Sequence, residues 1–359
     1  METENKKVKK QLMTFSLLND CQTQIADNKE GDVRNKKYVS WGTENNYPNY
    51  LYDLYCNVPT LSTIINGICD YVSGDGIEGT MAGKIVNSRG EYTEELVREL
   101  AFNIANTGGL AIQVNMQKNM AKVAETFCLP LRYVRTDVNA QSFTYCEGFG
   151  ERYKKKKEIV FPKFTKAFKN AEMVYYDKNA GTDIYPVPMY ASALNCCEIE
   201  KQINNYHLSA INNGFAGNYV INFNNGEPTE EEKKEIERRM NDKFAGANNA
   251  GKMVFAWNDN KENAITVEKL EVEDYGEKYN SLVKRVEQQI YSCFRATPNL
   301  FGIATESNGF NSEEYSSAFK LFNKTIISPI QRRIERALND IYGEGSVHII
   351  PFNIDFNNE

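Results

Sequence analysis

Residues 274–302 read DYGEKYNSLVKRVEQQIYSCFRATPNLFG, and this stretch decides how the second half of the molecule is organised. Apolar side chains recur in it at spacings of three and four residues, which is typical of one face of an amphipathic helix. Pro298 and Gly302 then break the pattern, so the sequence predicts a helix from about Asp274 that ends in a loop. The apolar positions are Tyr275, Tyr279, Leu282, Val286, Ile290 and Phe294.

A second helical pattern precedes this stretch, over about residues 189–213 and directly after Pro186 and Pro188. Its apolar stripe is imperfect, which suits a helix that packs on neighbouring elements rather than inside one core. The stripe consists of Leu194, Ile199, Ile203, Tyr206 and Ala210.

A third helical pattern follows the loop and extends to Gly343, where the glycine is expected to end it. Pro329 removes one backbone donor inside this pattern, so we expect a kink or a split near Ser328. The loop itself, residues 297–312, is longer than most helix–helix connections, which favours a functional role. The apolar positions of the third pattern are Phe319, Phe322, Ile326, Ile330, Ile334, Leu338 and Ile341.

Between the first two helices lies an insert, residues 217–272, with the features of a small α/β unit. Residues 219–223 and 252–257 are rich in β-branched and aromatic residues and predict two strands, and a third is expected near 265–267. Thr229 followed by Glu232 forms a capping box, so a helix is expected to begin there and to run to about Phe244.

The first half of the chain predicts an α+β domain over residues 38–186, behind a polar, flexible arm at residues 1–37. Helices are expected from Pro59 to Gly74 and from Tyr92 to about Asn106, with Thr93 as a candidate cap. Short strands are expected at residues 110–115, 129–134, 143–145, 158–161 and 173–176. A last strand is expected in the tail near Val347.

The composition fits a folded chain of two or more sub-domains. The 359 residues carry a net charge of −6, which argues against a general nucleic-acid coat protein. The eight cysteines form no CxxC motif and only two histidines are present, so we expect reduced thiols, no metal site and no cofactor. No apolar run is long enough to span a membrane, and polar residues interrupt the short apolar stretch behind the N-terminal lysines.

No arrangement of residues typical of catalysis is found, so no catalytic residue is predicted and the chain is not expected to be an enzyme. The GxGxxG motif at Gly74–Gly79 follows a helix rather than a strand, unlike a dinucleotide site. The acidic residues between Glu227 and Glu232 are explained by the start of a helix. An alternative stays open, in which the acidic residues at 227–235 serve a metal-dependent nucleic-acid-processing enzyme.

A basic run allows two interpretations. It is either a solvated hairpin or a docking surface for an acidic partner or nucleic acid. The run consists of Arg152, Lys154 to Lys157, Lys163, Lys166 and Lys169.

The order of several short motifs over residues 38–343 resembles that of the portal proteins of tailed bacteriophages. Each motif is degenerate alone, but their order and spacing together are specific. They are WGTENNYP at 41–48, the helix from Pro59 that ends in SGDG at 73–76, Asn213-Gly214, the Gly246–Lys252 loop before a strand, FRATPNLFG at 294–302, and Glu313-Glu314 before the helix that contains Pro329.

The resemblance implies a ring, typically of twelve subunits, through which double-stranded DNA passes at one capsid vertex of the virion. The implied parts are a wing (38–186 with 313–343), a stem (187–216 and 273–296), a clip (217–272) and a tunnel loop (297–312). A short tail (344–359) implies a minimal or absent crown. The implied partners are the terminase large subunit, a head–tail adaptor and the major capsid or scaffold protein, with assembly in the host cytoplasm. Another virion structural or connector protein is the remaining alternative.

Within this resemblance two sets of residues are candidates for function. A channel must meet phosphates at many positions without holding any strongly, which suits a polar loop without lysine. The DNA-facing candidates in the tunnel loop are Asn299, Glu306, Ser307, Asn308 and Asn311. The candidates for docking on the clip are Glu230, Glu231, Lys233, Lys234 and Arg238.

Overall fold

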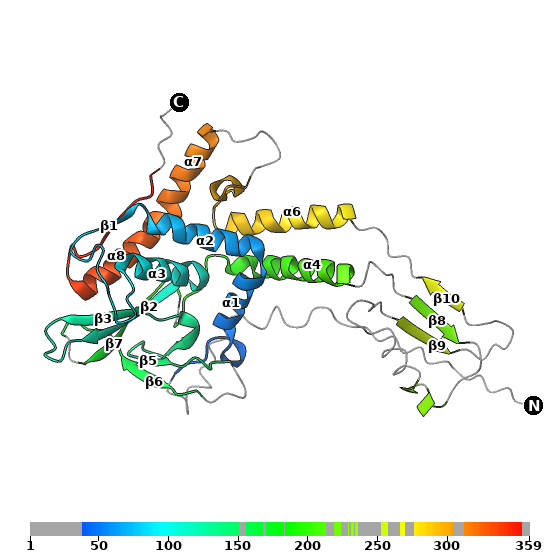
Figure 1. The fold of residues 1–359 in the computed structure, drawn as a ribbon, viewed down its shortest axis with the longest axis horizontal. Helices are drawn as coiled ribbons and strands as arrows, with labels where there is room; N and C mark the ends of the chain where they lie inside the picture. The colour runs from blue at the N-terminus through cyan, green and yellow to red at the C-terminus, as the bar shows by residue number, and fades with distance from the viewer. Residues whose placement is uncertain are drawn as a thin grey trace, which may run out of the picture.

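A computed structural model describes residues 38–150, 156–167, 170–182, 184–212, 219–223, 229, 231–232, 234–235, 253–257, 266–269, 276–303 and 312–353. Figure 1 shows a body of helices and sheets from which α4 and α6 project side by side. The fold is α+β, as the sequence predicts.

The helices of the body come from both halves of the chain. The first half contributes α1 (Tyr47–Asn57), α2 (Pro59–Ser73) and α3 (Thr93–Thr107), and the projecting pair is α4 (Leu194–Asn212) and α6 (Gly276–Cys293). The last helices are α7 (Ser312–Phe322) and α8 (Ser328–Tyr342), joined by a π-helical segment, η6 (Asn323–Ile327). Short 3-10 helices are η2 (Thr43–Asn45), η3 (Leu131–Tyr133), η4 (Ala191–Ala193) and η5 (Pro298–Phe301).

The strands in the described ranges form four small sheets. Two antiparallel sheets lie in the body, one in the order β3-β2-β7 and one in the order β4-β5-β6. A third sheet, in the order β10-β8-β9, combines a parallel and an antiparallel pair. The strands are β2 (Gly109–Met116), β3 (Val123–Cys128), β4 (Val134–Thr136), β5 (Ser142–Tyr145), β6 (Ile159–Pro162), β7 (Glu172–Lys178), β8 (Tyr219–Phe223), β9 (Met253–Trp257) and β10 (Thr266–Lys269).

Helix α2 lies at the centre of the body. Pro59 occupies its first turn and Gly74 caps its C-terminus, so both ends are fixed by sequence. Its aliphatic side chains are fully buried, and α1, α3, α6 and α8 pack around it. The fully buried side chains are Leu61, Ile64, Ile65, Ile68 and Val72.

Arg135 on β4 is a buried cation that fixes the turn before α1. Its guanidinium donates to the backbone oxygen of Asn45 at 2.8 Å and also to the side-chain Oδ1 of that residue. It donates further to the carbonyl oxygens of Arg132 and Val134, and it lies 4.5 Å from the ring centroid of Phe149. Burial lowers the pKa of Arg135 to about 10. The buried charge of Arg135 therefore holds the motif at 41–48 in place, and no sequence pattern indicated this role of Arg135.

One strand prediction is wrong. Residues 129–134 were expected to form a strand, but Leu131–Tyr133 form η3 and the strand β4 begins only at Val134. The N–H of Tyr133 donates to the carbonyl oxygen of Pro130, which closes a tight turn in place of a sheet ladder. Thr93 is also not the cap of α3, because Tyr92 holds that position and its N–H donates to Glu95.

The split near Pro329 is confirmed. Helix α8 begins at Ser328, with Pro329 in its first turn. The preceding residues Asn323–Ile327 are π-helical, which accommodates the lost hydrogen bond by widening one turn. The chain continues from α7 to α8 without a loop, and Gly343 ends α8 as expected.

The predicted tail strand is present as β11 (His348–Ile350), and it pairs antiparallel with β1 (Gly76–Glu78) inside the GxGxxG motif. A Cβ at Gly74 would lie 1.9 Å from the carbonyl oxygen of Ile350, and one at Gly79 would lie 2.4 Å from that of Ser346. Glycine at these positions therefore lets the C-terminal strand approach the backbone closely.

We predict that Gly74→Ala weakens the fold more than Gly83→Ala. Both glycines have nearly the same positive φ (62° and 61°), but a Cβ at Gly83 would meet nothing within 4 Å. Gly83→Ala should therefore cost about 1–2 kcal/mol from backbone strain alone. Gly74→Ala should cost about 2 kcal/mol more, because β11 must move and because a ψ of −155° places Gly74 in a region that is nearly restricted to glycine. Urea unfolding of both variants measures the difference, and equal losses would contradict the steric role of Gly74.

Candidate functional site: the projecting helix pair and the loop at its base

At the base of the projecting pair, α4 and the preceding η4 contact α6 through polar side chains. The Sγ of Cys196 lies 3.1 Å from Oε1 of Gln289, and the Oγ of Ser192 lies 3.3 Å from Sγ of Cys293. The seven described cysteines are free thiols. Val286 and Ile290 of α6 are buried at this base.

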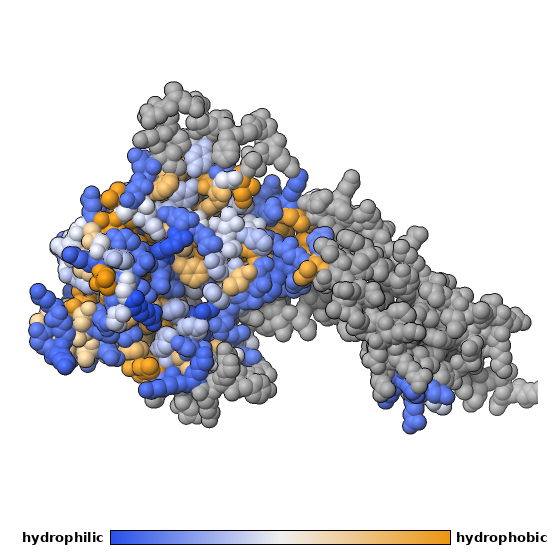
Figure 2. Space-filling model, in the orientation of Figure 1, coloured by the Kyte–Doolittle hydropathy of each residue, from blue (hydrophilic) through white to orange (hydrophobic). Residues whose placement is uncertain are grey.

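Farther from the body the pair does not cover its own apolar side chains. Residues 204–209 of α4 are all exposed. Figure 2 shows apolar surface in orange along this pair, where it leaves the body. The large exposed apolar side chains on the two helices are Ile199, Tyr206, Leu208 and Leu282.

Glu200 ties α4 to the body. Its Oε1 accepts a hydrogen bond from the N–H of Thr60, in the first turn of α2, at 3.1 Å. A carboxylate is favoured there by the unpaired N–H groups and by the helix dipole. Its Oε2 is buried without a hydrogen-bond partner, as is the hydroxyl of Tyr291 on α6. Burial, and secondarily the nearby charge of Glu287, raises the pKa of Glu200.

We predict that Glu200→Gln changes how stability depends on pH. Because the folded-state pKa of Glu200 is raised above the ordinary value of 4.5, its contribution to stability is full below pH 4.5 and is lost as the pH rises through the folded pKa. The free energy of unfolding of the parent protein should therefore exceed that of the variant by less, or fall below it, as the pH rises from 4.5 to 7.5. Urea unfolding across this range measures it.

The matched control for this prediction is Glu198→Gln, which removes the same charge from the same helix at a side chain bonded to Gln202. It should leave the pH profile of unfolding close to that of the parent. A parent-minus-variant difference for Glu200→Gln that stays constant with pH would contradict the prediction.

The loop that follows α6 begins with a turn fixed by its backbone. Arg295 has a positive φ of 52°, and the N–H of Ala296 donates back to the carbonyl oxygen of Tyr291. Residues Pro298–Phe301 then form η5, in which Leu300 is buried. Gly302 caps η5 in the left-handed region. The first half of the 297–312 loop is thus an ordered part of the body.

The structure describes one of the five candidate residues in this loop. Asn299 lies on η5, where its Oδ1 accepts a hydrogen bond from the hydroxyl of Thr297. The other four candidates, Glu306, Ser307, Asn308 and Asn311, lie outside the described residues. Their place relative to Asn299 stays a prediction.

The insert contains the predicted strands and the predicted capping box. Glu232 accepts a hydrogen bond from the N–H of Thr229 at 2.9 Å, and the N–H of Glu232 approaches Oγ1 of Thr229 at 3.4 Å. The bond from Thr229 lowers the pKa of Glu232, which explains this carboxylate by local structure. Glu231 and Lys234 are exposed. The remaining docking candidates, Glu230, Lys233 and Arg238, lie outside the described residues.

Two of the four described lysines of the basic run form ion pairs with acidic side chains. Lys156 lies 3.6 Å from a carboxylate oxygen of Glu147, and Lys166 lies 2.8 Å from one of Asp340 on α8. Arg152, Lys154, Lys155 and Lys169 lie outside the described residues. These ion pairs are exposed and contribute little to stability.

In the part of the chain that the structure describes, no helix is long and apolar enough to cross a membrane. Within the same ranges, no three His, Cys, Asp or Glu side chains come together in a way that would hold a metal ion.

This arrangement defines a class of protein in which an α+β body carries a projecting helix pair, with a small sheet inserted between the two helices. The family described as phage portal protein matches residues 89–356 in sequence, which is well over half of the chain. No curated protein matches the chain in sequence.

Solved structures with a similar fold agree with this match. A chain from the virion of a native gene transfer agent particle superposes with a TM-score of 0.55 at 15% identity, over 86% of this chain and 84% of that one. A chain from the neck of the native particle, computed with C12 symmetry, gives 0.54 at 14% identity, over 87% and 85%. An HK97-family phage portal protein from Corynebacterium diphtheriae gives 0.52 at 11% identity, over 84% and 94%.

The chain therefore belongs to the phage portal protein family. Proteins of this family are structural rather than enzymatic, and they serve as head–tail connectors of the virion.

Proposed function

We propose that this chain assembles into a ring, typically of twelve subunits, that forms the DNA channel at one capsid vertex. The observation that carries the proposal is the α4–α6 pair, whose exposed apolar side chains Ile199, Tyr206, Leu208 and Leu282 offer a surface to a neighbouring subunit. In a closed ring every subunit supplies that neighbour to the next, so no apolar face stays open. A similar chain belongs to a neck computed with C12 symmetry, which supports twelve copies.

The partners follow from this position in the virion. The ring would admit double-stranded DNA during packaging, retain it, and release it at ejection. The insert would dock the terminase large subunit and later the head–tail adaptor, and the body would contact the major capsid or scaffold protein. Assembly would take place in the host cytoplasm. Electron microscopy of the purified protein tests the ring: a persistent monomer, even with scaffold and capsid partners present, would count against it.

We predict that deleting residues 303–310 leaves ring assembly largely intact but impairs DNA packaging or retention. The deleted stretch lies between η5 and α7, and the contacts of Tyr71 with Leu300 and Tyr315 lie outside it. Polar contacts between the loop and phosphates are individually weak. Their loss should therefore change the behaviour of the particle only while DNA is being packaged or retained under force. Ring images and the DNA content of assembled particles measure the two effects. A deletion that abolishes folding would instead assign the loop a structural role.

We predict that exchanging the charges of Glu231 and Lys234, by Glu231→Lys with Lys234→Glu, weakens docking of the packaging motor by about tenfold while rings still form. Both side chains are exposed in the insert, and the exchange keeps the net charge. Binding of the terminase large subunit to purified rings measures the effect. The matched control exchanges the exposed pair Glu147 and Lys156 on the body, which should bind the motor normally. Equal binding of the motor by both variants would show that the insert is not part of the docking surface.

A further inference from the structure

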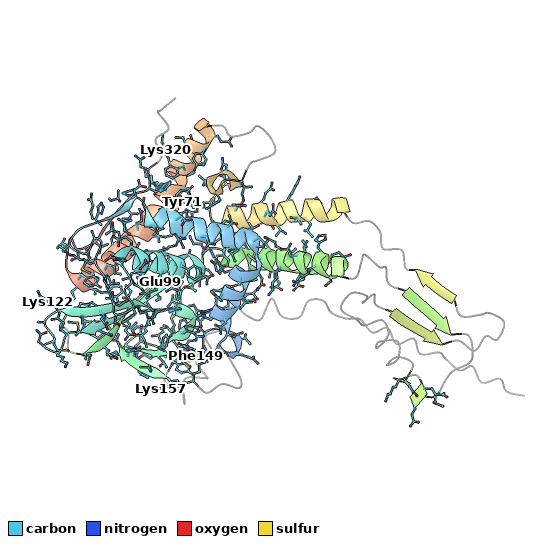
Figure 3. All side chains as sticks on the ribbon, in the orientation of Figure 1. Tyr71, Glu99, Lys122, Phe149, Lys157 and Lys320 are labelled. Carbon is cyan, nitrogen blue, oxygen red and sulfur yellow. The ribbon has the colours of Figure 1, made fainter. Side chains whose placement is uncertain are left out.

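A single side chain on α2 contacts both ends of the loop. The hydroxyl of Tyr71 donates a hydrogen bond of 2.6 Å to the carbonyl oxygen of Leu300 in η5. The same hydroxyl lies 3.4 Å from the hydroxyl of Tyr315 on α7. Leu300 precedes residues 304–311 and Tyr315 follows them. Figure 3 labels Tyr71 on α2 below α7, close to η5.

Aromatic rings on three sides hold the Tyr71 ring in place. Ring centroids of four phenylalanines lie 5.3–6.3 Å from that of Tyr71, three of them edge-on and one tilted. Such edge-to-face contacts fix the orientation of a buried ring, and therefore the direction of its hydroxyl. The four are Phe301 from η5, Phe319 and Phe322 from α7, and Phe352 from the C-terminal tail.

Gly67, one helical turn before Tyr71, makes a second contact with η5. A Cβ at Gly67 would lie 2.3 Å from Cδ1 of Phe301, so the ring packs directly on the backbone of α2. Glycine is unfavourable inside a helix, and its presence there indicates a packing reason. Residues four apart lie on one face of a helix, so Gly67 and Tyr71 hold η5 from the same side.

We propose that Gly67 and Tyr71 form a clamp that positions the 297–312 loop, with Tyr71 acting through Leu300 and Tyr315 as a positioning residue. This inference rests on the function proposed above, in which the loop faces DNA. Any force that DNA exerts on the loop reaches the body through the two ends of the loop, because the chain joins η5 and α7 there.

The hydroxyl of Tyr71 separates this role from ordinary core packing. A core residue needs only the ring, and phenylalanine supplies the same ring. The variant Tyr71→Phe therefore keeps the packing and removes the donor, which leaves the carbonyl oxygen of Leu300 unpaired. If Tyr71 positions η5, this variant loosens η5. If Tyr71 is only a core residue, the variant changes the packing and stability of the body very little.

The first measurement is amide hydrogen exchange in assembled rings. The N–H of Gly302 donates to the carbonyl oxygen of Asn299, and that of Ile303 donates to Pro298, so both report on the order of η5. In Tyr71→Phe these two amides should exchange roughly tenfold faster, the loss expected for one buried donor. Ring assembly and the melting temperature should stay close to those of the parent. Gly67→Ala, which displaces Phe301 directly, should give the same exchange pattern.

The second measurement is the DNA content of particles assembled with each variant, which should fall for Tyr71→Phe. The matched control is Tyr175→Phe, which removes a hydroxyl 3.2 Å from Asp340 on the far side of the body. It should change neither the exchange at Gly302 nor the DNA content.

The results separate the clamp from the proposed function. Parent-like exchange and parent-like DNA content in Tyr71→Phe would overturn the clamp, and so would an equal effect of Tyr175→Phe. If the 303–310 deletion also retains DNA normally, the proposed function of the loop fails. If that deletion loses DNA while Tyr71→Phe does not, only the clamp fails.

Discussion

Burial of α2 is the constraint on which the rest of the body depends. Its aliphatic side chains have no exposed surface, and its exposed residues Pro59, Asn66 and Asp70 lie along one stripe of the helix. A helix of this kind must be covered on several sides, and α1, α3, α6 and α8 cover it. Burying each of these side chains contributes roughly 1.5–3 kcal/mol. The base of the projecting pair, through α6, is therefore part of the same core as the body that it leaves.

Arg135 and Glu200, two charged side chains in this core, differ in how fully their polar atoms are hydrogen-bonded. Arg135 finds an acceptor for most of its donors and stacks near aromatic rings, so its charge holds the turn before α1 in one conformation. Glu200 satisfies one oxygen on the first turn of α2 and leaves the other without a hydrogen bond, next to a helix that carries Glu287. The first group specifies a fixed part of the fold. Glu200 makes the contact between the body and the projecting helix pair depend on the charge of its carboxylate.

The sequence predicted the elements whose signals are local. Helix α2 was found because an apolar period of three to four residues lies between Pro59 and Gly74, and the capping box at Thr229 was found from two residues. Helix α1 was missed because its tyrosines show no clean period, although Pro48 in its first turn is a start signal. Strand β3 was missed because Val123–Cys128 does not alternate cleanly between apolar and polar residues. The roles of Arg135, Glu200 and Tyr71 depend on partners 90, 140 and 229 residues away in sequence, which no local pattern contains.

The π-helical segment between α7 and α8 has a consequence for how the chain tolerates change. One wide turn holds one residue more than an α-helical turn, and each residue rotates an α-helix by about 100°. The segment Asn323–Ile327 therefore sets which way α7 faces relative to α8, while the helix stays continuous. Removing a single residue there would shorten the helix very little but would turn Phe319 and Phe322 away from α2. The number of residues in this segment therefore determines the angle between the faces of α7 and α8. Related chains that differ by one residue there would differ in the direction that α7 faces rather than in the length of the helix.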